Sequence, residues 1–501
     1  MRKFYFTILI LFLNQCDLNE SNSNPIILGL DKLDFTSKNN VFSPEFDTDI
    51  MHYGASFEND STVTLFASTK NENTEIYINN ELIGIGSINY NFTSIIPNGN
   101  IVIELKNEDE TLKYYLHSVS ENDPKVGVVK KTKFVDDGFI LIASTIKTVD
   151  NAKTFLLVID NNGVIRYKKV VEGQAGDFKK HNNGKYSYYS RTSRNEFNNM
   201  SSEIVVLNKY FEEENRIQCI NLNHTDGHDF LITQSGTYIL LSYHTNYRDF
   251  SSYGYSENEP VRDSYIQEIS NDGNVIFEWN SWDNIDINGC LNHRFPDDYA
   301  HINSIQIAPD GNIIASFRGC SSVLKIDRTS GETIWSIGGA NPTLQIEGDT
   351  YQEFCGQHTA SESQDGFLYM FDNGGHCNGD REDKFGSFSR ALQYKLDLNQ
   401  SKVTFIRDYS FKNKYTEYIT SGGSFFVTNN GNWLINWSKN INTVTEVSQN
   451  NEIEFEFNLL ADFDFYMKDS DTLRSYRAYR IYDVELPIYI NGNLIFEKFK
   501  N

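Results

Sequence analysis

One pattern recurs six times along this chain of 501 residues and restricts the folds that it can adopt. A dipeptide that ends in glycine, suited to a tight turn, stands before a strongly apolar, β-prone run, and a second strand and turn usually follow. The six dipeptides are Asp137-Gly138, Asn183-Gly184, Ser235-Gly236, Asp310-Gly311, Asp365-Gly366 and Asn430-Gly431. A two-layer sandwich gives no reason for a sixfold recurrence, whereas four-stranded units at intervals of about 46 to 75 residues are typical of a β-propeller. We therefore predict an all-β fold with a six-bladed propeller over residues 125–501, in which a last strand at 476–486 pairs with the first blade.

The region before the propeller, residues 27–120, is predicted to be a small β-sandwich. It contains short alternating runs at 62–68, 75–80, 89–95, 101–105 and 114–119, separated by Asn, Gly and Asp turns. It also resembles the cadherin-like β-sandwich repeats of bacterial surface proteins, and the residues that carry this likeness lie at 42–46, 53, 63–67, 98–100 and 111–116. No cluster of catalytic residue types occurs in it, so we expect a spacer or docking module.

The N-terminal residues 1–15 are typical of an export signal. Arg2 and Lys3 precede an apolar run of about ten residues, which is too short to span a bilayer, and the segment Leu13-Asn14-Gln15-Cys16 resembles a bacterial lipobox. The resemblance implies a lipoprotein anchored to a membrane through Cys16, in the periplasm or at the outer membrane or cell surface, with residues 16–26 as a tether. The alternative is a secreted protein with ordinary cleavage nearby.

The charge of the chain limits its partners. Acidic residues outnumber basic ones by 68 to 44, which gives a formal net charge of −24 and excludes a general nucleic-acid binder. The sequence leaves the oligomeric state open, a homodimer included.

Three histidines occupy comparable positions in successive repeats. His228, His301 and His358 each lie seven to nine residues before a leading turn, on what should be the innermost strand of a blade. Innermost strands line the central channel, so the three imidazoles are expected to converge there, with Arg318 at the end of the strand after His301. Buried structural histidines are one alternative, and a zinc or copper site is another, but a fixed arginine would repel a metal ion. Three histidines with an arginine suit a group with several anionic oxygens, and we expect no metal site.

Several ordered motifs then resemble those of the bacterial arylsulfotransferases. They are the stretch 301–339, Gln357-His358-Thr359-Ala360, Phe371-Asp372-Asn373-Gly374, Ser389-Arg390 and Ser475-Tyr476-Arg477-Ala478. By this resemblance the nucleophile falls on His358 and the supporting positions on His228, His301 and Arg318. The resemblance also includes Asn303, Asn373 and Arg390, as weaker candidates for substrate binding. His224 is interpreted as a loop residue, and His376 lies in a polar insertion.

The resemblance implies transfer of a sulfuryl group from an aryl sulfate donor to a phenolic acceptor. In that family the transfer is ping-pong, proceeds through a sulfated histidine, and needs neither 3'-phosphoadenylyl sulfate nor another cofactor. A neutral imidazole is a competent nucleophile, and an arginine can hold the sulfuryl oxygens. Two alternatives stay open: a ligand-binding or assembly propeller without catalysis, and a hydrolase that passes the group to water.

Five cysteines follow Cys16, and export would permit disulfides. Cys355 precedes His358 by three residues and Cys377 follows the hairpin partner of the same strand, which predicts a Cys355–Cys377 bridge. Cys290 and Cys320 are a second candidate pair, and the odd number leaves at least one thiol.

Overall fold

The computed structural model describes residues 28–499, apart from 38–40, 58–62, 93–99, 109, 121–122, 148–151, 195–199, 292–293, 352, 376, 378–385, 439–442, 461–471 and 491–492. The predicted signal peptide, the tether with Cys16, and His376 lie outside the described residues. No helix in the described part of the chain has the length and apolar character needed to cross a membrane.

The N-terminal region forms two sheets that share one core. The smaller sheet has the order β1-β4-β7, and the larger has the order β2-β3-β9-β8-β5-β6. Side chains from both sheets, such as Leu33 and Leu65 from one and Ile76 and Ile103 from the other, belong to a single buried cluster. The likeness to cadherin repeats stays a prediction. The strands are β1 (Leu30–Thr36), β2 (Phe42–Ser43), β3 (His52–Ala55), β4 (Val63–Thr69), β5 (Glu75–Ile78), β6 (Glu81–Ile85), β7 (Ser87–Phe92), β8 (Asn100–Lys106) and β9 (Thr111–Ser118).

The following region is built from antiparallel strands joined by short connections and a few single-turn helices. Its first half contains β10 (Lys125–Lys131), β11 (Phe139–Lys147), β12 (Ala152–Ile159), β13 (Ile165–Glu172), β14 (Ala175–Lys180), β15 (Tyr186–Arg194), β16 (Met200–Leu207), β17 (Glu213–Ile217), β18 (Thr225–Ile232), β19 (Tyr238–Arg248), β20 (Glu259–Ile269), β21 (Val275–Asn280) and α1 (Ser281–Asn284). Its second half contains β22 (Ile302–Ile307), β23 (Ile313–Phe317), β24 (Ser322–Ile326), β25 (Thr333–Gly338), β26 (Gln345–Glu347), β27 (His358–Glu362), β28 (Phe367–Asp372), β29 (Arg390–Asp397), β30 (Lys402–Ser410), β31 (Ser424–Val427), β32 (Trp433–Asn436), β33 (Thr443–Val447), β34 (Ile453–Leu460), β35 (Thr472–Ile481), β36 (Val484–Ile490) and β37 (Asn493–Phe499). The 3-10 helices are Ser251–Tyr253, Ile287–Gly289, Arg318–Cys320, Leu398–Gln400 and Phe411–Asn413.

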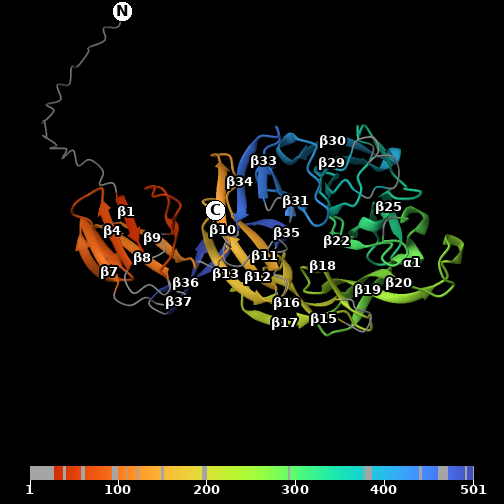
Figure 1. The fold of residues 1–501 in the computed structure, drawn as a ribbon, viewed down its shortest axis with the longest axis horizontal. Coiled ribbons are helices and arrows are strands. Elements are labelled where there is room, and N and C mark those ends of the chain that lie inside the picture. Colours follow the sequence, from red (N-terminus) through yellow and green to blue (C-terminus); the bar gives the residue numbers. More distant parts are fainter. Residues whose placement is uncertain are drawn as a thin grey trace, which may run out of the picture.

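These strands form a ring of sheets around an axis, as Figure 1 shows. The sheets with four or five strands are β35-β11-β12-β13, β14-β15-β16-β17, β18-β19-β20-β21, β22-β23-β24-β25, β27-β28-β29-β30-β26 and β31-β32-β33-β34-β10. Each is written here from its innermost strand outward, and we interpret each as one blade. Neighbouring sheets contact one another in turn, through β11 and β14, β16 and β18, β18 and β22, β22 and β27, β28 and β31, and β32 and β35. The predicted all-β fold of the propeller type is confirmed.

Both ends of this region close the ring. Strand β10 pairs with β34 at the outer edge of the last sheet, and β35 pairs with β11 as the inner strand of the first sheet. The predicted last strand at 476–486 differs in one respect. The strand ends at Ile481, Asp483 takes a left-handed backbone conformation with φ of 49°, and the chain continues into the separate β36–β37 hairpin.

That hairpin lies between the ring and the N-terminal sheets (Figure 1). Ile488 packs with Val102 and Tyr115, and the Tyr115 hydroxyl donates a hydrogen bond to Glu497 at 2.8 Å. The C-terminus of the chain therefore connects the two regions.

Candidate active site

Irregularities in the innermost strands place polar side chains on the axis of the ring. In β18, regular pairing with β19 is interrupted between Thr225 and Phe230, so that residues 226–229 bulge from the ladder. Similar shifts occur in β14 between 176 and 179, in β22 between 302 and 304, in β27 between 358 and 361, and opposite β35 between 475 and 478. Bulges redirect side chains that a regular strand would point to alternate faces. Here they leave His228 and Tyr476 lining one central cavity.

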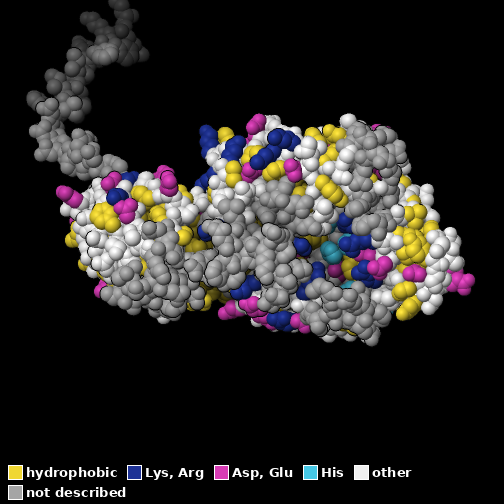
Figure 2. Space-filling view, in the orientation of Figure 1, with side chains coloured by type: hydrophobic (Ala, Val, Ile, Leu, Met, Phe, Trp, Pro, Cys, Tyr) yellow, Lys and Arg dark blue, Asp and Glu magenta, His cyan; other side chains and the backbone are white. Residues whose placement is uncertain are grey.

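The cavity has a volume of about 430 Å³, within the usual range for small-molecule sites. His228, His301, Arg318 and His358 all line it, and they come from three different sheets, since His301 and Arg318 flank β22 and β23 of the same sheet. Figure 2 shows histidine side chains in the middle of this face, bordered by Lys and Arg side chains. The structure therefore brings together the four residues that the sequence singled out for catalysis.

His358 is buried and held in one tautomer by Asn373. The Asn373 amide nitrogen donates to the carbonyls of Ile419 and Gly422 at 2.8 and 3.0 Å, so its Oδ1 must accept from His358 Nδ1, 2.6 Å away. Because Nδ1 carries the hydrogen, Nε2 keeps its lone pair, which meets only a long hydrogen bond of 3.3 Å from the Gly422 amide. Burial and the nearby Arg318 hold the pKa of His358 well below its usual range, so that the ring is neutral. His358 is thus a neutral imidazole with an available nitrogen.

His228 and His301 are each held by a carboxylate. Nδ1 of His228 lies 2.6 Å from Asp226 Oδ2, and Nδ1 of His301 lies 2.6 Å from Asp298 Oδ2. The two imidazole centroids are 5.0 Å apart. Burial lowers the pKa of His301 to about 4, although Asp298 opposes this shift. Within the described residues, no three His, Cys, Asp or Glu side chains are arranged to hold a metal ion.

Arg318 begins the 3-10 helix after β23 and is only 8% exposed. Its backbone N–H donates to the His301 carbonyl at 2.9 Å, and His301 itself has a left-handed backbone conformation with φ of 48°. Its guanidinium makes one long hydrogen bond, 3.3 Å, to the Thr420 carbonyl, and Nε has no partner among the described residues. A buried guanidinium with unused N–H groups suits an anionic ligand.

The three weaker candidates are placed differently, and none of them lines the cavity. Asn373 orients His358, as described above. Asn303 donates to the Gln357 carbonyl at 2.7 Å, which supports the residue before the nucleophilic position. Arg390 is fully buried between Asp349, Asp372 and Asp408, at 2.7, 2.8 and 3.0 Å. These contacts use its guanidinium within its own sheet, and a role in substrate binding stays a prediction.

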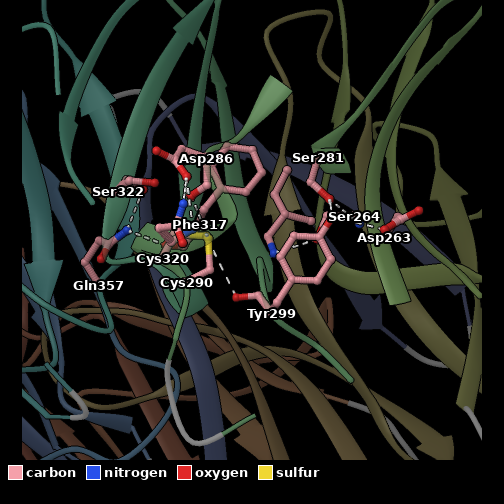
Figure 3. The surroundings of a disulfide bond; sticks show 12 residues. Asp263, Ser264, Ser281, Asp286, Cys290, Tyr299, Phe317, Cys320, Ser322 and Gln357 are labelled. Atoms are coloured by element: carbon pink, nitrogen blue, oxygen red, sulfur yellow. Dashed lines mark hydrogen bonds between the residues drawn. A yellow bond between two sulfur atoms is a disulfide. The ribbon is translucent and has the colours of Figure 1, made fainter. Parts of the chain in front are cut away.

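Two disulfides lie beside the site. The Cys355–Cys377 pair joins the segment before His358 to the segment after Asn373, as the sequence predicted. The second candidate pair, Cys290–Cys320, is also bonded, and Cys219 is a free thiol. Figure 3 shows that the Cys290–Cys320 bridge lies next to Phe317 and Tyr299. It fastens the loop after α1 to the helix that begins with Arg318.

Sequence reasoning missed several residues that line the cavity. Tyr476 lies between His228 and His358, with its ring centroid 5.8 and 5.9 Å from theirs, and its buried hydroxyl has no hydrogen-bond partner in the described part of the chain. His224 lies in the loop before β18, as the sequence predicted, but its side chain is buried and lines the cavity. The match at Ser475-Tyr476-Arg477-Ala478 was a signal for Tyr476. The sequence held none for His224.

The ring of sheets and a polar central cavity with a neutral, oriented histidine define a propeller protein built for group transfer. The family described as Arylsulfotransferase (ASST) matches residues 104–477, well over half of the chain, and the chain belongs to that family. It is therefore an arylsulfate sulfotransferase that acts on an aryl sulfate donor and a phenolic acceptor. No curated protein matches the chain.

Solved structures resemble the chain only remotely. A protein of unknown function from Bacteroides caccae shares 11% identity with a TM-score of 0.40, covering 64% of this chain and 93% of that one. A catalytically inactive virginiamycin B lyase from Staphylococcus aureus with quinupristin shares 11% identity with a TM-score of 0.34, covering 75% and 96%. A quinonprotein alcohol dehydrogenase-like protein from Bacteroides thetaiotaomicron shares 10% with a TM-score of 0.31, covering 88% and 98%.

Proposed function

We propose that the protein transfers the sulfuryl group by a ping-pong mechanism in which Nε2 of His358 is the nucleophile, without 3'-phosphoadenylyl sulfate. The observation that carries this proposal is the hydrogen-bond chain from Ile419 and Gly422 through Asn373 to His358, because it fixes the tautomer whose Nε2 has a lone pair. The weak bond from the Gly422 amide opens when Nε2 attacks sulfur.

In the first half-reaction, a bond forms between His358 Nε2 and sulfur while the bond between sulfur and the phenolic oxygen breaks. The leaving phenolate keeps the electron pair and takes a proton from water, because neutral His301 has no proton on Nε2 to give. Arg318 holds the sulfuryl oxygens during transfer, because its unused N–H groups face no competing carboxylate within the described residues.

His228 and His301 are placed to take the proton of the acceptor phenol and pass it on to water. Each has Nδ1 on a carboxylate, so its Nε2 is left for the phenolic oxygen. His301 is neutral near pH 7, since its pKa is about 4, and can take the proton of the acceptor phenol. The acceptor oxygen then attacks sulfur, and the bond from sulfur to Nε2 breaks.

Initial-rate kinetics with 4-nitrophenyl sulfate and a phenol test this scheme. Parallel plots, together with a sulfuryl adduct on the peptide that holds His358 after exposure to donor alone, are expected. Intersecting plots with an adduct on another residue would reassign the nucleophile. Release of nitrophenol at the same rate with and without phenol would identify a hydrolase, and no release at all would favour a binding propeller.

We also propose that the protein is exported and anchored through a lipidated Cys16, which the lipobox-like segment supports. Metabolic labelling with palmitate should mark the wild-type protein and not the Cys16→Ser variant. An unlabelled wild-type protein found in the medium would show ordinary secretion instead.

A further inference from the structure

Arginines accumulate around the catalytic cavity of a protein that is acidic as a whole. Five arginines and only two carboxylates, Asp226 and Asp298, line the cavity, whereas the complete chain carries a formal charge of −24. The arginines are Arg191, Arg262, Arg294, Arg318 and Arg474. Such a local excess of one sign raises the concentration of ions of the opposite sign in a cleft.

Three of these arginines differ in depth. Arg318 is 8% exposed, whereas the side chain of Arg262 is 22% exposed and that of Arg294 is 41% exposed. Asp298 links two of them to His301, because it lies 2.6 Å from His301, 2.8 Å from Arg294 and 3.8 Å from Arg262. Guanidinium groups therefore extend from the deepest point toward the mouth of the cavity, and those of Arg262 and Arg294 are each paired with an aspartate.

Arg262 is held in place rather than free in solvent. It lies on β20, which forms a long hairpin with β19, and its guanidinium pairs with Asp297 at 2.6 and 3.0 Å. Asp297 is 65% exposed, so this ion pair is weakened by water, and an anionic group of a ligand can compete with Asp297 for the guanidinium of Arg262. The guanidinium also lies 6.0 Å from the ring of Tyr243, whose centroid is 5.8 Å from that of His301. The aromatic ring of a substrate that stacks on Tyr243 would thus lie near both His301 and Arg262.

A simple aryl sulfate has one negative charge, and Arg318 provides for it. We propose that Arg262 and Arg294 form a second anion subsite, so that this enzyme prefers aryl substrates that carry a second anionic group, such as a carboxylate or another sulfate, on the ring. This inference rests on the proposed function. Donor and acceptor use the same cavity in a ping-pong scheme, so the preference applies to both.

The test compares two donors of similar shape, 4-carboxyphenyl sulfate and 4-carbamoylphenyl sulfate, which differ in one charge. The readout is the ratio of their kcat/KM values in each variant. A general loss of activity, or a difference in leaving group, cancels when the ratio of a variant is divided by that of the wild type. This matters because Asp298 connects Arg294 to His301.

We expect Arg262→Gln to lower the wild-type preference for the carboxylate about tenfold, and Arg294→Gln to lower it less because it is more exposed. Arg262→Lys should keep most of the preference, since the charge remains. Arg216→Gln is the matched control, because Arg216 is an exposed arginine on β17 that does not line the cavity. Raising the salt concentration should weaken the wild-type preference.

The two proposals fail in different ways. Unchanged ratios in Arg262→Gln and Arg294→Gln, or no wild-type preference, would overturn the second subsite while turnover of both donors upheld the transferase. A wild-type protein that transfers sulfuryl from neither donor, nor from 4-nitrophenyl sulfate, would overturn the proposed function and the subsite with it.

Discussion

Two cavities lie on the inner strands of the ring, and they use buried charge in opposite ways. The second cavity, of about 920 Å³, is lined by Lys179, Asp229 and Arg477, among others. There the charges cancel: Lys179 lies 2.7 Å from Asp177, and Arg477 lies 3.1 Å from both Asp177 and Asp229. In the catalytic cavity, Arg318 has no carboxylate within salt-bridge distance among the described residues. Adjacent residues, such as His228 and Asp229 or Tyr476 and Arg477, divide between the two cavities.

This difference separates structural from functional charge. A buried ion that has all its partners adds little net stability, but removing one partner is costly because the other charge is left buried. A buried cation that lacks a carboxylate is stabilised only when a ligand supplies one. By this criterion Arg390 and Arg477, whose carboxylate partners are all buried, are structural, and Arg318 is the candidate for binding an anion. Arg262 and Arg294 are intermediate, because each has a carboxylate partner but a partly exposed guanidinium.

The largest expected effect comes from replacing His358 in the catalytic cavity, and the same replacement of a histidine in the second cavity is the control. His358→Ala should lower transfer by at least ~10³-fold and abolish the sulfuryl adduct, because no other nucleophile replaces it. His181 is the matched control: it is buried, lines the second cavity, and its Nε2 lies 2.7 Å from Ser187 Oγ. His181→Ala should keep the adduct. Equal losses in both variants would show that His358 acts only through packing.

Removing Arg477 should mainly affect stability. Arg477→Ala leaves Asp177 and Asp229 with Lys179 alone, and the free energy of unfolding should fall by about 3–5 kcal/mol, measured by denaturant titration. The exposed Arg216, which pairs with Glu213, is a suitable control and should lose about 1 kcal/mol or less when changed to Ala. A stable Arg477→Ala protein would contradict the structural role of the cluster.

Replacing Arg318 with another cation tests whether its shape matters as well as its charge. Arg318→Lys keeps the charge but loses the planar fork, so turnover should drop at least ~10-fold, about 1.4 kcal/mol of barrier, while the melting temperature stays unchanged. Arg390→Lys should lower the melting temperature and leave turnover nearly unchanged, because it disrupts contacts to three aspartates. Near-normal kinetics in Arg318→Lys would place Arg318 among the structural arginines.

The sequence predicted what depends on local pattern and missed what depends on three-dimensional packing. The glycine turns predicted the strands of the ring, and the phase of His228, His301 and His358 predicted their meeting. The orientation of His358 was not predictable from the sequence. It depends on the Asn373 amide, which is held by the carbonyls of Ile419 and Gly422 in a distant loop.

Bulges explain most of the other omissions. Alternation along a strand predicts only that His228 and Asp229 point to opposite faces, and no sequence rule located the interrupted pairing between Thr225 and Phe230 in which both residues lie. His224 and Arg294 lie outside regular strands, where no periodicity exists to predict which way a side chain points.

The smallest expected effect is on the pH dependence of the first half-reaction, and it tests whether His358 is shielded from water. Burial holds the pKa of His358 well below 6.5 and that of His301 at about 4. Both rings therefore stay neutral as pH falls from 7.5 to 5.5, and the single-turnover rate with 4-nitrophenyl sulfate should change by less than about threefold. If the nucleophile were an exposed histidine with a pKa of ~6.5, this rate would fall about tenfold over the same range. Stability should behave differently: the folded-state pKa values lie below the unfolded value, so the unfolded chain binds more protons below pH 6.5, and the free energy of unfolding should decrease as pH falls from there toward 4. A tenfold fall in the rate with a midpoint near 6.5 would show that water reaches His358 in the free enzyme.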